Sequence, residues 1–115
     1  MEVTVCHKDH ETNAFVRVAV VNADTTDESA ALEYAYRWTQ NIMDSWSLKM
    51  ENDGNDDVEV VGELPVYDGK TYGLRSSMMG DRFYVDEGDA YECAMIGFKP
   101  LPVSPEIMMT PEDAV

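Results

Sequence analysis

The sequence predicts an α+β fold, in which one amphipathic helix packs on a mostly antiparallel sheet in the order β-β-α-β-β-β. Three features indicate this fold class: two β-branched stretches near the N-terminus, one long stretch with apolar residues at helical spacing, and later strands separated by short turn sequences. With 115 residues, 44% of them hydrophobic, the chain suffices for one packed core. We therefore expect a single domain over residues 1–99.

The first two expected strands form a hairpin. Residues 2–7 alternate, with Val3 and Val5 pointing to one side, which is the period of a strand. Residues 14–22 are rich in β-branched side chains and predict the second strand. The polar residues 8–13 between them are typical of a long antiparallel connection.

A helix is expected over residues 27–44. Thr25 and Glu28 have the spacing of a capping box, and acids stand where the helix dipole is positive. The apolar stripe at i, i+4, i+7 and i+11 consists of Ala31, Ala35, Trp38 and Ile42. This stripe is expected to cover one face of the sheet.

The second half of the chain predicts three more strands. Residues 58–64 form the first of them, and Pro65 is expected to end it. An Asp-Gly turn lies within residues 67–70. Residues 82–85 and 91–98 predict a further hairpin.

The composition changes at the C-terminal end. Residues 100–115 contain four of the five prolines, namely Pro100, Pro102, Pro105 and Pro111, and have no apolar repeat. This segment is expected to be an extended or disordered tail.

The charge of the chain restricts its partners. It carries 8 Lys and Arg against 23 Asp and Glu, which gives a net charge of −15. Phosphate neutralisation requires clustered cations, so direct binding to nucleic acid or to an anionic membrane is not expected. No apolar run approaches the ~20 residues of a membrane span, and the N-terminus lacks a basic, apolar leader. We expect a protein of the host cytoplasm.

Few residues suggest chemistry at a reactive centre. His7 and His10 stand near Cys6 and could bind a divalent metal, but a polar turn is the favoured interpretation. Cys6 and Cys93 are expected to be buried thiols, with a bridge between them as the alternative. Ser77 lies outside any nucleophile-elbow motif. We therefore expect no catalytic residue, no metal and no cofactor.

One part of the chain resembles a known kind of module. Residues 72–83, with the pattern Ser-x-x-x-Gly-Asp at 76–81, are followed by residues 89–93 and by Gly-Phe-Lys-Pro-Leu at 97–101. This pattern is similar to the ending of YodL-type modules, which occur in proteins of phages, plasmids and other mobile elements. The segment 32–47 also resembles small phage proteins. The resemblance implies a mobile-element accessory protein and carries over no catalytic residue.

The acidic residues provide the main functional hypothesis. Spaced carboxylates can imitate a row of phosphates and attract a basic protein surface. Residues 44–63 hold one base, Lys49, and the following candidate acids: Asp44, Glu51, Asp53, Asp56, Asp57, Glu59 and Glu63. Tyr34 and Arg37 could add a recognition face on the helix, although a partly buried tyrosine is the simpler interpretation.

These residues predict a non-catalytic accessory protein that binds and inhibits a host protein, for example a nucleic-acid-binding defence factor, through a DNA-mimic surface. The alternative is a small virion structural or assembly component whose proline-rich end enters a neighbouring subunit. Solubility alone also explains an acidic surface. The sequence leaves the oligomeric state open, and a homodimer through edge strands is one option.

Overall fold

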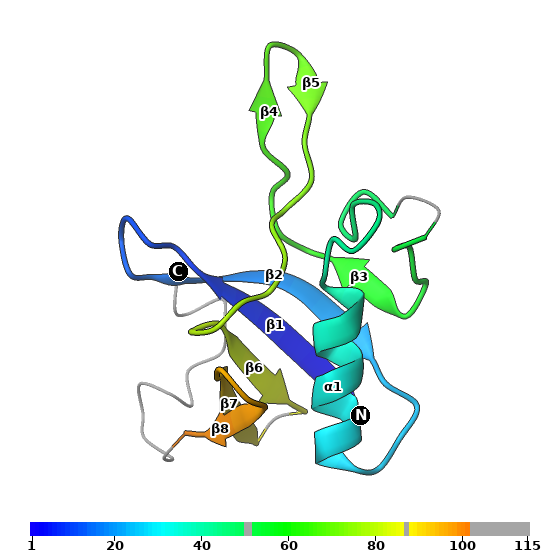
Figure 1. Cartoon of the computed structure of the whole chain (residues 1–115), viewed down its shortest axis with the longest axis vertical. Helices are drawn as coiled ribbons and strands as arrows, with labels where there is room; N and C mark the ends of the chain where they lie inside the picture. Colours follow the sequence, from blue (N-terminus) through cyan, green and yellow to red (C-terminus); the bar gives the residue numbers. More distant parts are fainter. Residues whose placement is uncertain (50–51, 87, 102–115) are drawn as a thin grey trace.

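The computed structural model describes residues 1–49, 52–86 and 88–101, and its main element is a six-stranded antiparallel sheet (Figure 1). The strand order is β3-β2-β1-β6-β7-β8. The strands are β1 (Glu2–Lys8), β2 (Phe15–Asn22), β3 (Val58–Val60), β6 (Arg82–Val85), β7 (Asp89–Cys93) and β8 (Phe98–Pro100). One helix, α1 (Glu28–Trp38), packs on this sheet, so the predicted α+β class is confirmed.

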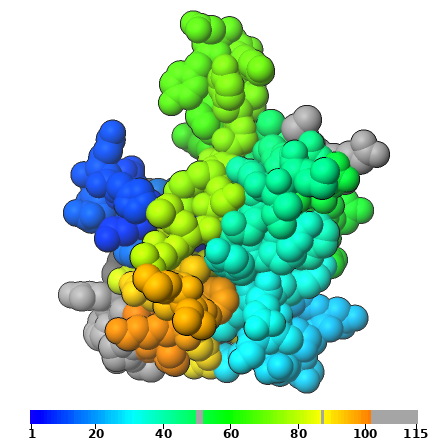
Figure 2. All heavy atoms as spheres, viewed as in Figure 1, coloured from blue at the N-terminus to red at the C-terminus, as the bar shows by residue number. Residues whose placement is uncertain are grey.

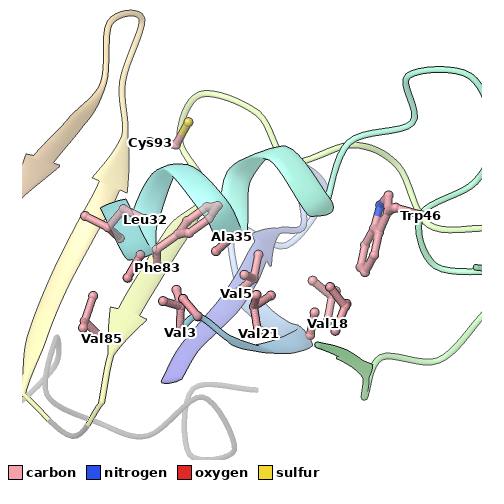
Figure 3. Packing of buried hydrophobic residues seen from close by; sticks show 14 residues of the cluster. Val3, Val5, Val18, Val21, Leu32, Ala35, Trp46, Phe83, Val85 and Cys93 are labelled. Carbon is pink, nitrogen blue, oxygen red and sulfur yellow. The ribbon is translucent and has the colours of Figure 1, made fainter. Parts of the chain in front are cut away.

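The core lies between α1 and the face of the sheet that carries Val3 and Val5, here called the front face (Figure 3). Val3 pairs with Val21 and Val85, and Val5 pairs with Ala19 and Phe83, so these residues share that face. The helix contributes its own buried stripe, which consists of Ala31, Leu32 and Ala35. The buried side chains therefore alternate along the strands, recur at helical spacing along α1, and pack against each other.

A β-bulge interrupts the pairing of β1 with β2. The register shifts between Val5 and Cys6, where Val18 is the extra residue and is buried with the core. Cys6 pairs with Arg17 and Arg82 and points to the opposite, back face. Burial raises the pKa of Cys6 to about 12. Both cysteines are buried and free, so the alternative of a bridge is wrong.

The helix is shorter than residues 27–44. Asp27 is the N-cap, because its side chain accepts a hydrogen bond from the Ser29 amide. Thr39 follows the last helical residue, and its hydroxyl donates to the carbonyl of Ala35 at 2.8 Å. Ile42 is 59% exposed, so its predicted place in the buried stripe is wrong.

The predicted Asp-Gly turn is confirmed as the tip of a separate hairpin, here called the arm. Its strands are β4 (Val66–Tyr67) and β5 (Lys70–Thr71), joined by Asp68 and Gly69 at φ 52° and 77°. The arm stands clear of the body of the molecule (Figure 2).

Three expected boundaries shift. The strand predicted over 91–98 ends at Cys93, and Phe98 begins the separate strand β8. The strand predicted over 58–64 ends at Val60, since the amides of Val61 and Gly62 both donate to the carbonyl of Val18. Pro100 pairs with Tyr91 in the sheet, so the tail expected from residue 100 does not begin there. Residues 102–115 lie outside the described part of the chain.

Candidate interaction surface

The acids predicted over residues 44–63 do not form one exposed face. Asp53 is only 1% exposed, and Asp44 is half-buried and accepts hydrogen bonds from the amide and side chain of Asn52. Glu59 lies within β3 and pairs with Val20, which puts it on the back face. Glu63 comes after the C-terminal end of β3, which is the end away from Val58. Glu51 lies outside the described residues.

Asp53 organises the loop that follows α1. Its Oδ2 accepts hydrogen bonds from the amides of Ile42, Met43 and Asp44 at 2.5 to 3.1 Å. These backbone donors, the Asp44 amide first, hold the pKa of Asp53 below its usual range although burial opposes them. Asp53 therefore replaces the carbonyls that a longer helix would provide, and its buried carboxylate is engaged within the chain.

Arg37 and Tyr34 also make intramolecular contacts. The Arg37 Nη1 atom lies 3.4 Å from Asp53 Oδ1, and its guanidinium lies 4.1 Å from the centre of the Trp38 ring. The Tyr34 hydroxyl donates to Asp57 at 2.6 Å and accepts from Asn55 at 2.9 Å. Burial, followed by the bond to Asp57, raises the pKa of Tyr34. Both side chains help to fix the 53–57 loop against the helix.

The topology gathers acids from several segments at one end of the sheet, among them Asp56 and Asp57 of the predicted set. The register places Val58, Val21, Val3, Val85 and Asp89 in one row across five strands. Asp89 at the end of this row, the segments beyond the row and the first turn of α1 together form what we call the acidic pole. Its members are Glu2, Asp24, Asp27, Glu28, Asp56, Asp57, Asp86 and Asp89.

Hydrogen bonds tie these segments together. The Asn22 amide donates to the Asp57 carbonyl at 2.9 Å, which joins the end of β2 to the start of β3. The Glu2 amide donates to Asp86 Oδ1 at 2.9 Å, which joins β1 to the β6–β7 turn. The N-terminal amine of Met1 donates to the carbonyls of Ala23 and Thr25. The pole is therefore a fixed part of the fold.

A hollow of about 590 Å³ lies within the acidic pole, between the start of α1 and the β6–β7 turn. Its lining includes Asp27, Glu28, Asp86 and Asp89. A hydrogen bond to Asp89 raises the pKa of Glu28, and the charge of Asp86 acts in the same direction. The Tyr91 hydroxyl donates to Glu28 Oε2 at 3.2 Å. The raised pKa indicates a concentration of negative potential.

The lysines and arginines of the chain lie elsewhere, while the N-terminal amine of Met1 is a cation that lies at the pole. All 8 Lys and Arg fall among the described residues, and none belongs to the acidic pole. Arg37 contacts Asp53, and Arg75 makes a bidentate pair with buried Asp81 at 2.7 and 2.8 Å. Arg82 lies over the Phe15 ring at 4.0 Å. The charge of the molecule is therefore strongly polarised.

A buried polar network lies on the front face, at the other end of β1. His7 Nε2 is 3.0 Å from Ser77 Oγ, which is 2.7 Å from Thr39 Oγ1. The Asp81 carboxylate approaches the same His7 nitrogen at 3.9 Å, so it does not orient the second ring nitrogen as a catalytic triad requires. His10 is exposed and away from this network. The network joins β1, α1 and the 72–81 segment.

Within residues 1–49, 52–86 and 88–101, no cluster of three or more His, Cys, Asp or Glu side chains is arranged to hold a metal ion. The helix found in that part of the chain lacks the length and apolar character to cross a bilayer. The comparisons give no match to this chain, whether with protein-family models, with curated proteins or with solved structures.

Proposed function

We propose that this chain is a non-catalytic accessory protein of a phage or related mobile element, which binds and inhibits a host protein through the acidic pole. The observation that carries the proposal is the concentration of carboxylates at one end of the sheet, without a lysine or arginine among them. The partner presents a basic surface of the kind that binds nucleic acid.

Electrostatics supports this choice of partner. The acids come from the ends of several strands and from the first turn of α1, so they are held at fixed spacing by the backbone. Fixed carboxylates can occupy the sites that a partner uses for phosphates, and their field speeds the encounter with a cationic surface. Because Arg37 and Arg75 pair with buried carboxylates, few cations weaken that field.

The resemblance of residues 72–101 to YodL-type modules supports a mobile-element context and the host cytoplasm as the place of action. The same residues contain Arg75, Ser77 and Asp81, which make internal contacts. The resemblance therefore supports a mobile-element source for the protein, while the acidic pole supports the choice of a basic partner.

Affinity capture from a host lysate tests the proposal. The wild type is expected to retain a basic nucleic-acid-binding protein at low salt and to release it at high salt. The double variant Asp24→Lys with Asp56→Lys should bind this partner at least about tenfold more weakly, because two contacts become repulsive. Nucleic acid should compete with the wild type for the captured partner.

The matched control for capture is Glu11→Lys with Glu33→Lys. This pair alters the net charge equally at exposed positions outside the acidic pole. It should retain the partner. Equal losses in the two double variants would show that net charge alone acts, and would refute the acidic pole as the binding surface.

We also propose an alternative, a virion structural or assembly component, which the projecting arm favours. Val66 and Tyr67 are 60% and 66% exposed, which suits insertion into a neighbouring subunit. Mass spectrometry of purified particles separates the two functions, because an intracellular inhibitor should be missing from them.

A further inference from the structure

The arm projects from the body of the molecule (Figure 2). Its two strands have two residues each and form a sheet of their own. Tyr67 and Tyr72 lie 5.8 Å apart between ring centres, and both are exposed, as is Val66. An isolated two-stranded hairpin is marginally stable in water. Exposed apolar side chains on such a hairpin indicate a surface that binds another protein.

A groove lies at the base of the same arm. Its volume is about 440 Å³, and its apolar walls come from Val16 and Val18 of β2 and from Val61 and Leu74, which flank the arm. Val18, the extra residue of the bulge, is buried with the core and adds little exposed surface to this wall. The groove is therefore built from the two chain segments that enter and leave the arm, together with the end of β1 and the start of β2.

The charges of the arm tip and of the groove complement each other. The tip carries exposed Asp68 and exposed Lys70. The groove lining includes the cationic residues Lys8, Arg17 and Arg75 and the acids Asp9 and Glu63. Asp9 caps its own turn by accepting from the Glu11 amide. Arg75 pairs with Asp81.

We propose that the arm binds the base groove of a second copy of this chain, so that two copies exchange arms in a twofold dimer. When two arms lie antiparallel, each tip reaches the base of the other. Val66 and Tyr67 then cover the apolar wall of the partner's groove. Asp68 then faces the partner's Lys8, and Lys70 faces the partner's Glu63.

The placement of the acidic pole favours this occupant over other docking faces. The arm follows the end of β3 that lies away from the acidic pole, and the groove contains the last residues of β1. Two copies joined there keep their acidic poles apart, which limits repulsion between chains of charge −15. The outer strands β3 and β8 are short, and β8 contains Pro100, so they favour pairing less.

Light scattering on full-length chains at moderate salt and at several protein concentrations tests the dimer. The wild type should approach twice the monomer mass as concentration rises. Asp68→Lys and Lys8→Glu should each weaken association at least about tenfold, because two symmetric contacts become repulsive. An equimolar mixture of these two variants should restore the dimer, since both contacts in the mixed pair join opposite charges.

Matched controls separate these contacts from net charge. Asp24→Lys changes the charge as Asp68→Lys does, and Lys49→Glu changes it as Lys8→Glu does, at exposed positions outside the arm and groove. Both controls should associate like the wild type. Val66→Ser with Tyr67→Ser should give a folded monomer. A wild type that stays monomeric, or a mixture that stays monomeric, would overturn the proposal. Binding of the arm to a different protein, without self-association of this chain, would also overturn it.

Discussion

A single buried histidine gives the fold a response to pH. His7 is buried with its Nε2 beside Ser77 Oγ and its ring against Trp46, at 6.2 Å between ring centres. Burial lowers the pKa of His7 to about 4, although Asp81 nearby acts in the opposite direction. The native state therefore resists a protonation that the unfolded chain accepts near pH 6.5.

This depressed pKa predicts acid lability. Between pH 6.5 and about 4 the unfolded chain binds a proton at His7 that the native chain does not, so stability falls as the pH falls. The full loss is about 3 kcal/mol. His7→Gln, which keeps polar atoms for Ser77, should remove this part of the pH dependence. Urea unfolding of both chains at pH 7 and at pH 4.5 measures the difference.

Other groups also titrate in that range, since protonation of surface carboxylates relieves repulsion at low pH. The effect of His7 is therefore isolated by the difference in free energy of unfolding between the wild type and His7→Gln at each pH. A gap between wild type and His7→Gln that stays constant from pH 7 to 4.5 would contradict the role of His7.

At the scale of elements, two buried carboxylates act as ligands for backbone and define where segments begin and end. Asp53 binds the amides that follow α1. Asp81 accepts from the Lys8 amide at 2.8 Å and from the Met78 amide at 2.7 Å, and it pairs with Arg75. Burial alone would raise the pKa of Asp81, but the Arg75 pair and these amides outweigh it and lower the pKa.

Asp81→Asn should therefore loosen the 72–81 segment from β1. The amide group cannot accept the bidentate pair of Arg75 together with two backbone bonds, and the expected loss of stability is about 2 kcal/mol. Hydrogen exchange should rise at the amides of Lys8 and Met78. Glu11→Gln, at an exposed position outside the arm and groove, serves as the control and should leave the exchange of these amides unchanged.

The same carboxylates explain where sequence reasoning was right and where it was not. Strand alternation around Val3 and Val5 depends on local pattern alone, and it correctly predicted the core face of β1. The helix was predicted to include Ile42, because the apolar spacing continues past Trp38. The helix ends because Thr39 caps its last turn and the Asp53 carboxylate binds the amides that follow. A contact between residues so far apart in the sequence leaves no periodic signal.

At the scale of the whole molecule, charge distribution depends on topology more than on composition. The net charge follows from the sequence, but the acids of the segment 44–63 lie in different places. Asp53 is buried, Glu59 lies on the back face, and Asp56 and Asp57 belong to the acidic pole. The acidic pole joins residues from Glu2 to Asp89, which become neighbours only when antiparallel strands align their ends. The sequence feature that indicates the acidic pole is local: acids stand directly before or after a strand and at the start of the helix.

A concentration of like charge predicts that salt stabilises the fold. Added salt screens repulsion within the acidic pole, so the melting temperature of the wild type should rise with ionic strength. Asp24→Asn with Asp56→Asn should raise stability at low salt by about 1 kcal/mol, an effect that shrinks as salt is added. Glu11→Gln with Glu33→Gln, which removes equal charge elsewhere, should gain less. Calorimetry across a salt series compares the three chains, and equal gains for both double variants would mean that repulsion is spread over the whole surface and is not concentrated at the pole.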